Sequence, residues 1–198
     1  MSLLAATEVA IDRGDRPLLR GVSLRIEAGE LWQLVGPNGV GKSSLMRALA
    51  GLARLGVEGT IQCDTSTLFI GHSTALKRAL TSLDNLRLHP ACDTPVGDEQ
   101  IRHALSAVSL SGYELVPVGA LSAGQRRRVA LARLCLTPAR LWFLDEPFTA
   151  LDTAGCQWLE QQIAGHVASG GAVLFTSHQQ SRFGAHQHDL DLTRYANL

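Results

Sequence analysis

The stretch that decides the fold is Gly36-Pro37-Asn38-Gly39-Val40-Gly41-Lys42-Ser43, with Ser44 directly after it. An apolar run, 31–35, precedes this stretch, and a segment with the apolar spacing of a helix, 45–50, follows it. Three glycines let the backbone turn its N–H groups inward, and the helix presents the positive end of its dipole. This order of strand, glycine-rich loop and helix predicts a phosphate-binding loop formed by residues 36–44, with a nucleotide as ligand.

Two side chains at the end of the loop have separate expected roles. Lys42 is placed to reach the β- and γ-phosphates of the nucleotide. Ser43 is placed to hold Mg²⁺ through its hydroxyl. The loop therefore predicts ATP and Mg²⁺ as cofactors.

The composition indicates one folded domain over residues 1–198. Of the 198 residues, 45% are hydrophobic and only 18% are charged, which is enough apolar material for one sizeable core. The 18 basic and 18 acidic residues cancel, so no overall attraction to nucleic acid or anionic lipid is expected. Four scattered cysteines without a C-x-x-C pair are typical of reduced thiols in the cytosol. No run of 18 apolar residues suggests a membrane span.

The hydrophobic pattern predicts an α/β fold with two additions. An antiparallel β-subdomain is expected first, from alternating strands at 4–11 and 18–26 joined by a turn at 13–17. A helical subdomain at about 82–136 is inserted into the α/β core. Further strands are predicted at 60–63, 67–70, 141–144, 172–176 and 190–192, and helices at 43–52, 123–136 and 152–167.

Two acids follow the apolar run 141–144, as expected of a central parallel strand that ends at a nucleotide site. Asp145 is expected to hold Mg²⁺, usually through water. Glu146 is expected to polarise the attacking water as a general base. A nucleotide-gated binding module without turnover is the alternative, and Glu146 argues against it.

Leu121-Ser122-Ala123-Gly124-Gln125, which opens the helix at 123–136, resembles the signature of the ABC-transporter ATPases. That family has glycine where Ala123 stands, a small change that still permits close approach of the backbone. The resemblance implies a P-loop NTPase core of ABC type, working as a homodimer packed head to tail. It also implies that Ser122, Gly124 and Gln125 of one copy meet the γ-phosphate held by Lys42 of the other.

Two further segments match the same family. Leu151-Asp152 resembles the loop that couples the two nucleotide sites. His178, which follows the strand predicted at 172–176, resembles the switch histidine and is expected to be catalytic. The arginines at 126–128 point about 100° apart around a helix, so they cannot form one nucleic-acid-binding stripe.

Within the family, the segments 69–77, 80–86 and 147–152 resemble the haem-exporter ATPases of bacterial cytochrome c biogenesis. His72 stands where family members usually carry a glutamine that touches Mg²⁺ or the attacking water, so it is also assigned to catalysis. The resemblance implies a peripheral subunit at the cytoplasmic face of the bacterial inner membrane. It would bind integral membrane subunits, contact the membrane only through them, bind no nucleic acid, and couple ATP hydrolysis to haem export or to release of a haem-loaded chaperone.

The adenine-binding segment departs from the family pattern. The family commonly stacks the base on an aromatic side chain near the first hairpin, but residues 7–19 contain none, and Arg13 is the nearest planar candidate. Weak base discrimination, with GTP able to substitute, is therefore expected.

Two other functions remain open at this level. One is an ATPase subunit that serves an ABC transporter for another small molecule. The other is a soluble ABC ATPase of DNA maintenance, but those carry long coiled coils between loop and signature, and no sustained heptads occur here.

Overall fold

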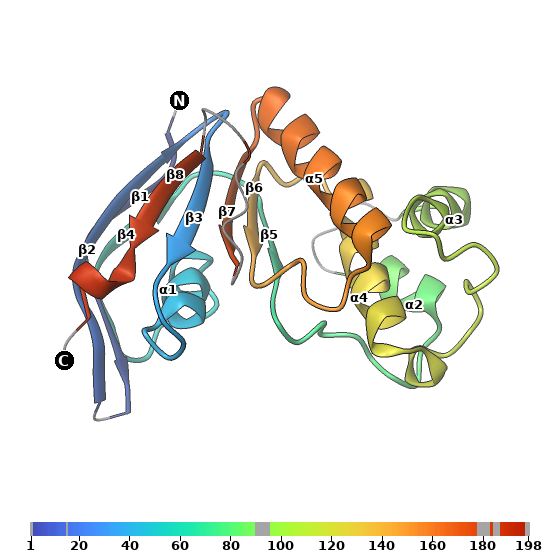
Figure 1. Cartoon of the computed structure of the whole chain (residues 1–198), viewed down its shortest axis with the longest axis horizontal. Helices are drawn as coiled ribbons and strands as arrows, with labels where there is room; N and C mark the ends of the chain where they lie inside the picture. Colours follow the sequence, from blue (N-terminus) through green and yellow to red (C-terminus); the bar gives the residue numbers. More distant parts are fainter. Residues whose placement is uncertain (1, 15, 90–95, 178–182, 184–186, 197–198) are drawn as a thin grey trace.

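The computed structural model describes residues 2–14, 16–89, 96–177, 183 and 187–196. It contains an antiparallel sheet, a parallel sheet and a group of helices on the far side of the parallel sheet (Figure 1). This arrangement confirms the predicted α/β fold with its β-subdomain. That residues 1–198 form one domain, with a helical subdomain at about 82–136, stays a prediction.

The antiparallel sheet has the order β2-β1-β4, with β1 at Ser2–Arg13, β2 at Arg16–Glu27 and β4 at Val57–Cys63. The sheet is longer than the sequence pattern predicted, because β2 begins at Arg16 within the expected turn. Register shifts in β1 between Ala6 and Val9 mark an irregularity around Glu8, which has a φ of 52°.

The parallel sheet has the order β5-β6-β7-β3-β8. Its strands are β3 (Leu31–Val35), β5 (Thr67–Ile70), β6 (Leu141–Leu144), β7 (Ala172–Thr176) and β8 (Gln187–Asp191). Every residue of β6 and β7 is buried, which explains why both read as continuous apolar runs. The predicted strand at 190–192 was misplaced, since β8 ends at Asp191 and Leu192 begins a 3₁₀ turn, η3 (Leu192–Arg194).

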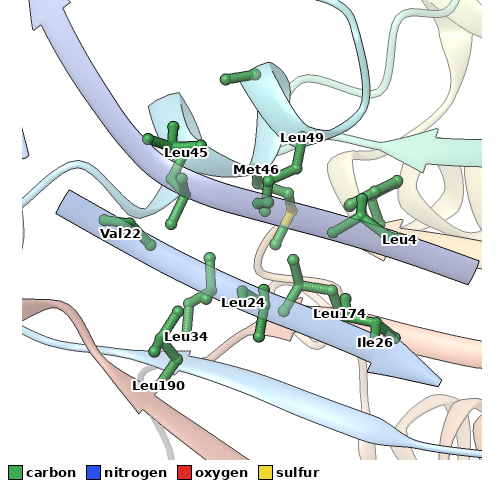
Figure 2. Packing of buried hydrophobic residues seen from close by; sticks show 14 of the residues in the cluster. Leu4, Val22, Leu24, Ile26, Leu34, Leu45, Met46, Leu49, Leu174 and Leu190 are labelled. Carbon is green, nitrogen blue, oxygen red and sulfur yellow. The ribbon is translucent and has the colours of Figure 1, made fainter. Parts of the chain in front are cut away.

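Helix α1 (Lys42–Leu49) lies between the two sheets. Its buried residues Leu45, Met46 and Leu49 pack in one cluster with side chains from both sheets, such as Leu4 and Leu174 (Figure 2). Because the cluster fixes α1 from both sides, replacing Leu45 by alanine would cost about 2–5 kcal/mol of stability. The loop that precedes α1 is held on a rigid part of the molecule.

The remaining helices gather beyond β5 and β6 (Figure 1). They are α2 (Ser82–Arg87), α3 (Asp98–Ala107), α4 (Ala123–Leu131) and α5 (Thr153–Ala168), with 3₁₀ turns η1 (Val118–Ala120) and η2 (Ala132–Cys135). The helix predicted at 123–136 therefore changes to 3₁₀ geometry at Ala132. Trp158 of α5 packs against both the parallel-sheet core and the core of α2, α3 and α4, so it joins the two.

Candidate functional site

The predicted site segments follow four neighbouring parallel strands at the same edge of the sheet. Register pairs join Ile70 to Leu144, Leu144 to Phe175, and Leu34 to Thr176. The residues just after β5, β6 and β3, together with the last residue of β7, must therefore lie close together. This edge is the usual place for a ligand in an open parallel sheet.

The phosphate loop has the backbone shape that its glycines predicted. Gly36, Gly39 and Gly41 have φ values of 141°, 82° and 114°, a region that residues with a Cβ rarely adopt. Gly41 is the N-cap of α1, and within the described residues no side chain caps this helix start. The first N–H groups of α1, those of Lys42, Ser43 and Ser44, cannot reach an acceptor inside the helix. They are suited to a phosphate.

Lys42 lies across the loop that carries it. Its Nζ donates to the carbonyl oxygen of Gly36 at 2.7 Å and to that of Pro37 at 3.1 Å. Ser43, Asn38 and Gly39 are exposed, and a Cβ on Gly39 would meet no atom within 4 Å. The loop thus presents an open cradle next to a positive charge.

A cavity of about 530 Å³ adjoins the loop, lined by Arg16, Pro17, Leu18, Pro37, Asn38, Gly39, Val40, Thr193 and Ala196. Arg13, the planar candidate suggested by the sequence, is not among these residues, whereas Arg16 is. Arg16 lies on β2 with Pro17 and Leu18, which also line the cavity, whereas Arg13 is the last residue of β1. The 3₁₀ turn η3 contributes Thr193 to the lining, which no sequence pattern indicated.

Asp145 and Glu146 are fixed by one hydroxyl. Asp145 is buried at 4% exposure, and the Thr176 Oγ1 donates to its Oδ1 at 2.8 Å. The same oxygen accepts the backbone N–H of Glu146 at 2.8 Å. The backbone N–H of Asp145 donates to the Ile70 carbonyl at 2.8 Å. Neither the role of Thr176 nor the left-handed φ of Glu146, 49°, was predicted from the sequence.

His72 lies against Glu146. Its Nδ1 is 3.3 Å from Oε2 of Glu146, and 69% of the histidine side chain is exposed. The structure thus brings together two of the three residues that the sequence assigned to catalysis; the third, His178, lies outside the described residues.

The signature segment begins α4 with a closed set of hydrogen bonds. The exposed Ser122 accepts the N–H of Gln125 at 3.2 Å, and Gln125 Oε1 accepts the N–H of Ser122 at 2.8 Å. This capping box satisfies two N–H groups at the helix start. A Cβ on Gly124 would lie 3.0 Å from the Ala150 carbonyl oxygen, so glycine permits close contact with the loop before α5.

The three arginines of α4 have three different sets of partners. Arg126 donates to the carbonyl of Leu121. Arg128 donates to the Val108 carbonyl at 2.8 Å and to Asp152 at 2.6 Å. Both bonds tie α4 to neighbouring segments.

Arg127 is buried at 4% exposure and donates to four backbone carbonyls. These are Gly71 at 2.7 Å, Glu146 at 2.7 Å, Asp145 at 3.0 Å and Pro147 at 3.3 Å. Burial lowers the pKa of the Arg127 guanidinium, and the negative charges of Asp145 and Glu146 oppose that shift. The sequence excluded a nucleic-acid-binding stripe at residues 126–128 but did not indicate which of the three arginines is buried.

Asp152 acts as the N-cap of α5, accepting the N–H of Gly155 at 2.8 Å. That backbone N–H, followed by the charge of Arg128, lowers the pKa of the Asp152 carboxyl. The coupling loop predicted at 151–152 therefore has a contact to the signature helix α4 through Arg128.

The model of the ABC transporter family matches residues 19–149, which run from β2 through the phosphate loop and signature to the loop after Glu146. The chain belongs to the ABC transporter family. Membership makes it a nucleotide-binding ATPase and implies dimerisation and membrane partners in general. Within the described part of the chain, no helix is long and apolar enough to cross a bilayer.

Several curated relatives cover nearly the whole chain. A cytochrome c biogenesis ATP-binding export protein CcmA from Pseudomonas syringae pv. tomato is 45% identical over 96% of this chain and 95% of its own length. Proteins of the same name from Tatumella citrea and Salmonella typhi are 45% and 46% identical, each over 89% of this chain and 89% or 90% of their own. The resemblance to the cytochrome c biogenesis ATPases is confirmed.

Solved structures share the fold. A Pyrococcus furiosus chain described as an ABC transporter ATP-binding protein superposes with a TM-score of 0.81 at 23% identity, covering 98% of this chain and 99% of its own. An ATP-binding subunit of an ABC transporter gives a TM-score of 0.79 at 24% identity over 89% and 79% of the two chains. The predicted ABC-type core is confirmed.

Proposed function

We propose that the chain is the ATP-hydrolysing subunit of a membrane ABC complex that serves cytochrome c biogenesis, either exporting haem or releasing a haem-loaded chaperone. The observation that carries the ATPase assignment is the convergence of the glycine loop, Asp145, Glu146 and His72 at one edge of the parallel sheet. The haem pathway is supported by the full-length similarity to relatives named for cytochrome c biogenesis.

The residues at this edge fit Mg-ATP. The open cradle at Gly39 and the uncapped start of α1 suit the phosphates, and the cavity beside Arg16 and Thr193 has room for the nucleoside. Bound Mg²⁺ would neutralise charge on the phosphates and prefers oxygen ligands such as Ser43 and Asp145. Thr176 donates to Oδ1 of Asp145 and so holds that carboxylate in place.

Each catalytic side chain then has one task. Glu146 accepts a proton from the attacking water, and His72 orients the Glu146 carboxylate through the contact at 3.3 Å. Lys42 moves from the carbonyls of Gly36 and Pro37 to the phosphate oxygens. His178 is assigned to the same reaction by its place after β7.

A second copy completes the site. The exposed Ser122, with Gly124 and Gln125, is assigned to the nucleotide held by the other copy, which makes the working unit a homodimer. A helix start contributes about 0.3–1 kcal/mol to anion binding in exposed settings, and more when the contact is buried. Integral membrane subunits of the haem export complex bind this dimer at the cytoplasmic face of the inner membrane, and the chain contacts the bilayer only through them.

The decisive experiment is Glu146→Gln in the assembled complex. Hydrolysis is expected to fall by about 10²- to 10⁴-fold, the usual contribution of a general acid or base, while ATP binding is retained. Glu160→Gln on the exposed face of α5 is the matched control and should keep the parental rate. A parental rate in Glu146→Gln would overturn the catalytic assignment.

The pathway is tested by isolating the chain from native membranes and measuring haem in the associated subunits. Integral membrane proteins together with a haem-binding chaperone are expected. Membrane partners without haem, but with another cargo, would move the assignment to a different ABC transporter. Recovery with DNA and no membrane subunit would contradict the transport assignment altogether.

A further inference from the structure

We propose that Arg127 and Thr176 are positioning residues that together set the backbone at Glu146 and thereby aim its carboxylate. The two residues are called the Glu146 brace below. This inference rests on the proposed role of Glu146 as the general base. Neither residue belongs to the motifs that predicted the site.

The backbone conformation of Glu146 is unfavourable, so other residues must stabilise it. Its φ of 49° lies in the left-handed region, which is costly for a residue with a Cβ. Without this turn, Asp145 and Glu146 would continue the direction of β6, and successive side chains of a strand point to opposite faces. The left-handed residue is what allows two consecutive acids to serve one site.

Thr176 holds the amino side of Glu146. Its Oγ1 accepts the N–H of Glu146 at 2.8 Å and donates its proton to Oδ1 of Asp145 at 2.8 Å. Thr176 is fully buried at the end of β7, where a β-branched side chain has little rotamer freedom. One hydroxyl therefore fixes the peptide between the two acids.

Arg127 holds the carboxyl side. Its Nη2 donates to the carbonyl oxygens of Glu146 at 2.7 Å and Asp145 at 3.0 Å, and its Nε to that of Pro147 at 3.3 Å. Three successive carbonyls turn toward one guanidinium, which stays charged and whose planar fork is rigid. Lysine, with a single ammonium on a flexible stem, cannot make this set of bonds.

The same guanidinium reaches the partner of Glu146. Nη1 of Arg127 donates to the carbonyl of Gly71 at 2.7 Å, directly before His72. Arg127 therefore fixes the spacing between the loop that carries His72 and the loop that carries Glu146. Because Arg127 lies in α4 shortly after Ser122, the aim of the base follows the position of the signature helix.

The test compares Thr176→Val with Thr176→Ser in the assembled complex. Valine keeps the shape but removes the hydroxyl, and kcat is expected to fall by about 10- to 100-fold, with the KM for ATP within twofold, because a small misplacement of a catalytic group costs this much. Serine keeps the hydroxyl and should restore kcat to within about threefold of the parental value. Thr60→Val, an exposed site on β4, is the matched control for the substitution itself.

Arg127→Lys is the second variant, and it should lower kcat more than Thr176→Val because four carbonyls lose their donor. If that variant fails to fold, the threonine pair still decides the question. Unchanged kcat in Thr176→Val, or a raised KM with kcat intact, would overturn the brace.

A double mutant shows whether the brace acts through Glu146. In single-turnover measurements, Thr176→Val is expected to add no further loss to Glu146→Gln, since the base is already absent. A full additional loss would mean that Thr176 acts elsewhere, for example through Asp145, and would refute the proposal. If Glu146→Gln alone keeps the parental rate, the proposed function fails rather than the brace.

Discussion

The starts of α1 and α4 differ in how their N–H groups are satisfied. The start of α1 follows Gly41 and has no side-chain cap within the described residues, whereas the start of α4 is closed by Ser122 and Gln125. A helix end without a cap is ready for an anion at any time. A capped end offers fewer N–H groups to an anion, because the N–H groups of Ser122 and Gln125 already have acceptors. We infer that α1 holds the nucleotide in each copy and that α4 engages only when the second copy brings its phosphate.

Of the changes that test this comparison, Lys42→Ala is expected to have the largest effect, because Lys42 adds positive charge at the start of α1. Lys42→Ala should weaken ATP binding by about 10- to 100-fold, because hydrogen bonds to charged groups contribute about 1.5–3 kcal/mol. Isothermal titration of the isolated chain measures this change. Lys77→Ala removes the other lysine of the sequence, on an exposed loop, and should bind ATP normally. Equal weakening by both variants would show that net charge, not the α1 end, controls affinity.

Ser122→Ala tests the α4 end. Loss of the cap should lower stability by about 1 kcal/mol and reduce ATPase activity of the complex by about tenfold, with ATP binding to the single chain unchanged. Thr81→Ala removes an equivalent cap from α2, where Thr81 accepts the N–H of Asp84 at 3.0 Å. Thermal melts should show similar losses for both variants, and only Ser122→Ala should lose activity. Parental ATPase activity in Ser122→Ala would mean that the start of α4 does not engage the phosphate of the second copy.

His72 is expected to give a smaller effect than Ser122. Its Nδ1 lies 3.3 Å from Oε2 of Glu146, the contact proposed to orient that carboxylate. His72→Gln should lower kcat of the assembled complex by less than about tenfold, because a glutamine amide can still hydrogen-bond a carboxylate. An unchanged kcat would show that His72 does not orient Glu146.

The smallest expected effect is on the pH dependence of folding stability, through His89 just after α2. Burial, together with the charge of Arg133 next to the end of α4, lowers the pKa of His89 to about 4 from an ordinary value near 6.5. Between these values the unfolded chain binds more protons than the folded chain, so stability falls as the pH drops from about 6.5 toward 4. His89→Gln should lose less Tm between pH 7 and 5 than the parental chain. An identical loss would show that His89 does not contribute.

The buried elements of the fold could be predicted with their bounds. The strands predicted at 141–144 and 172–176 coincide with β6 and β7, which are buried along their whole length and therefore consist mainly of apolar residues. The strand predicted at 67–70 coincides with β5, an edge strand in which Leu68 and Ile70 are buried. The strand predicted at 190–192 overlaps β8 only at Leu190 and Asp191, because β8 begins at Gln187 and its exposed His188 and Asp189 interrupt the apolar pattern. The irregularity of β1 around Glu8 could not be predicted from the alternation of apolar and polar residues.

The parts of the candidate site that are formed by consecutive residues could be predicted from the sequence. The glycine loop and the acids after β6 follow from local sequence, because their roles depend on backbone shape and strand position. The contacts of Arg127 and Thr176 depend on which segments the fold brings together, and no local pattern contains that information. His72 lies between these cases, since its position was read from a family resemblance and its contact with Glu146 came from the structure.

The close approach of Gly124 to the Ala150 carbonyl has a consequence for how this protein can change over generations. A Cβ at position 124 would press on that backbone oxygen inside a single copy, whether or not a nucleotide is bound. A relative that had lost ATP hydrolysis would still gain stability from Gly124 and from the helix cap at Ser122, so the presence of these two residues does not by itself mark an active ATPase.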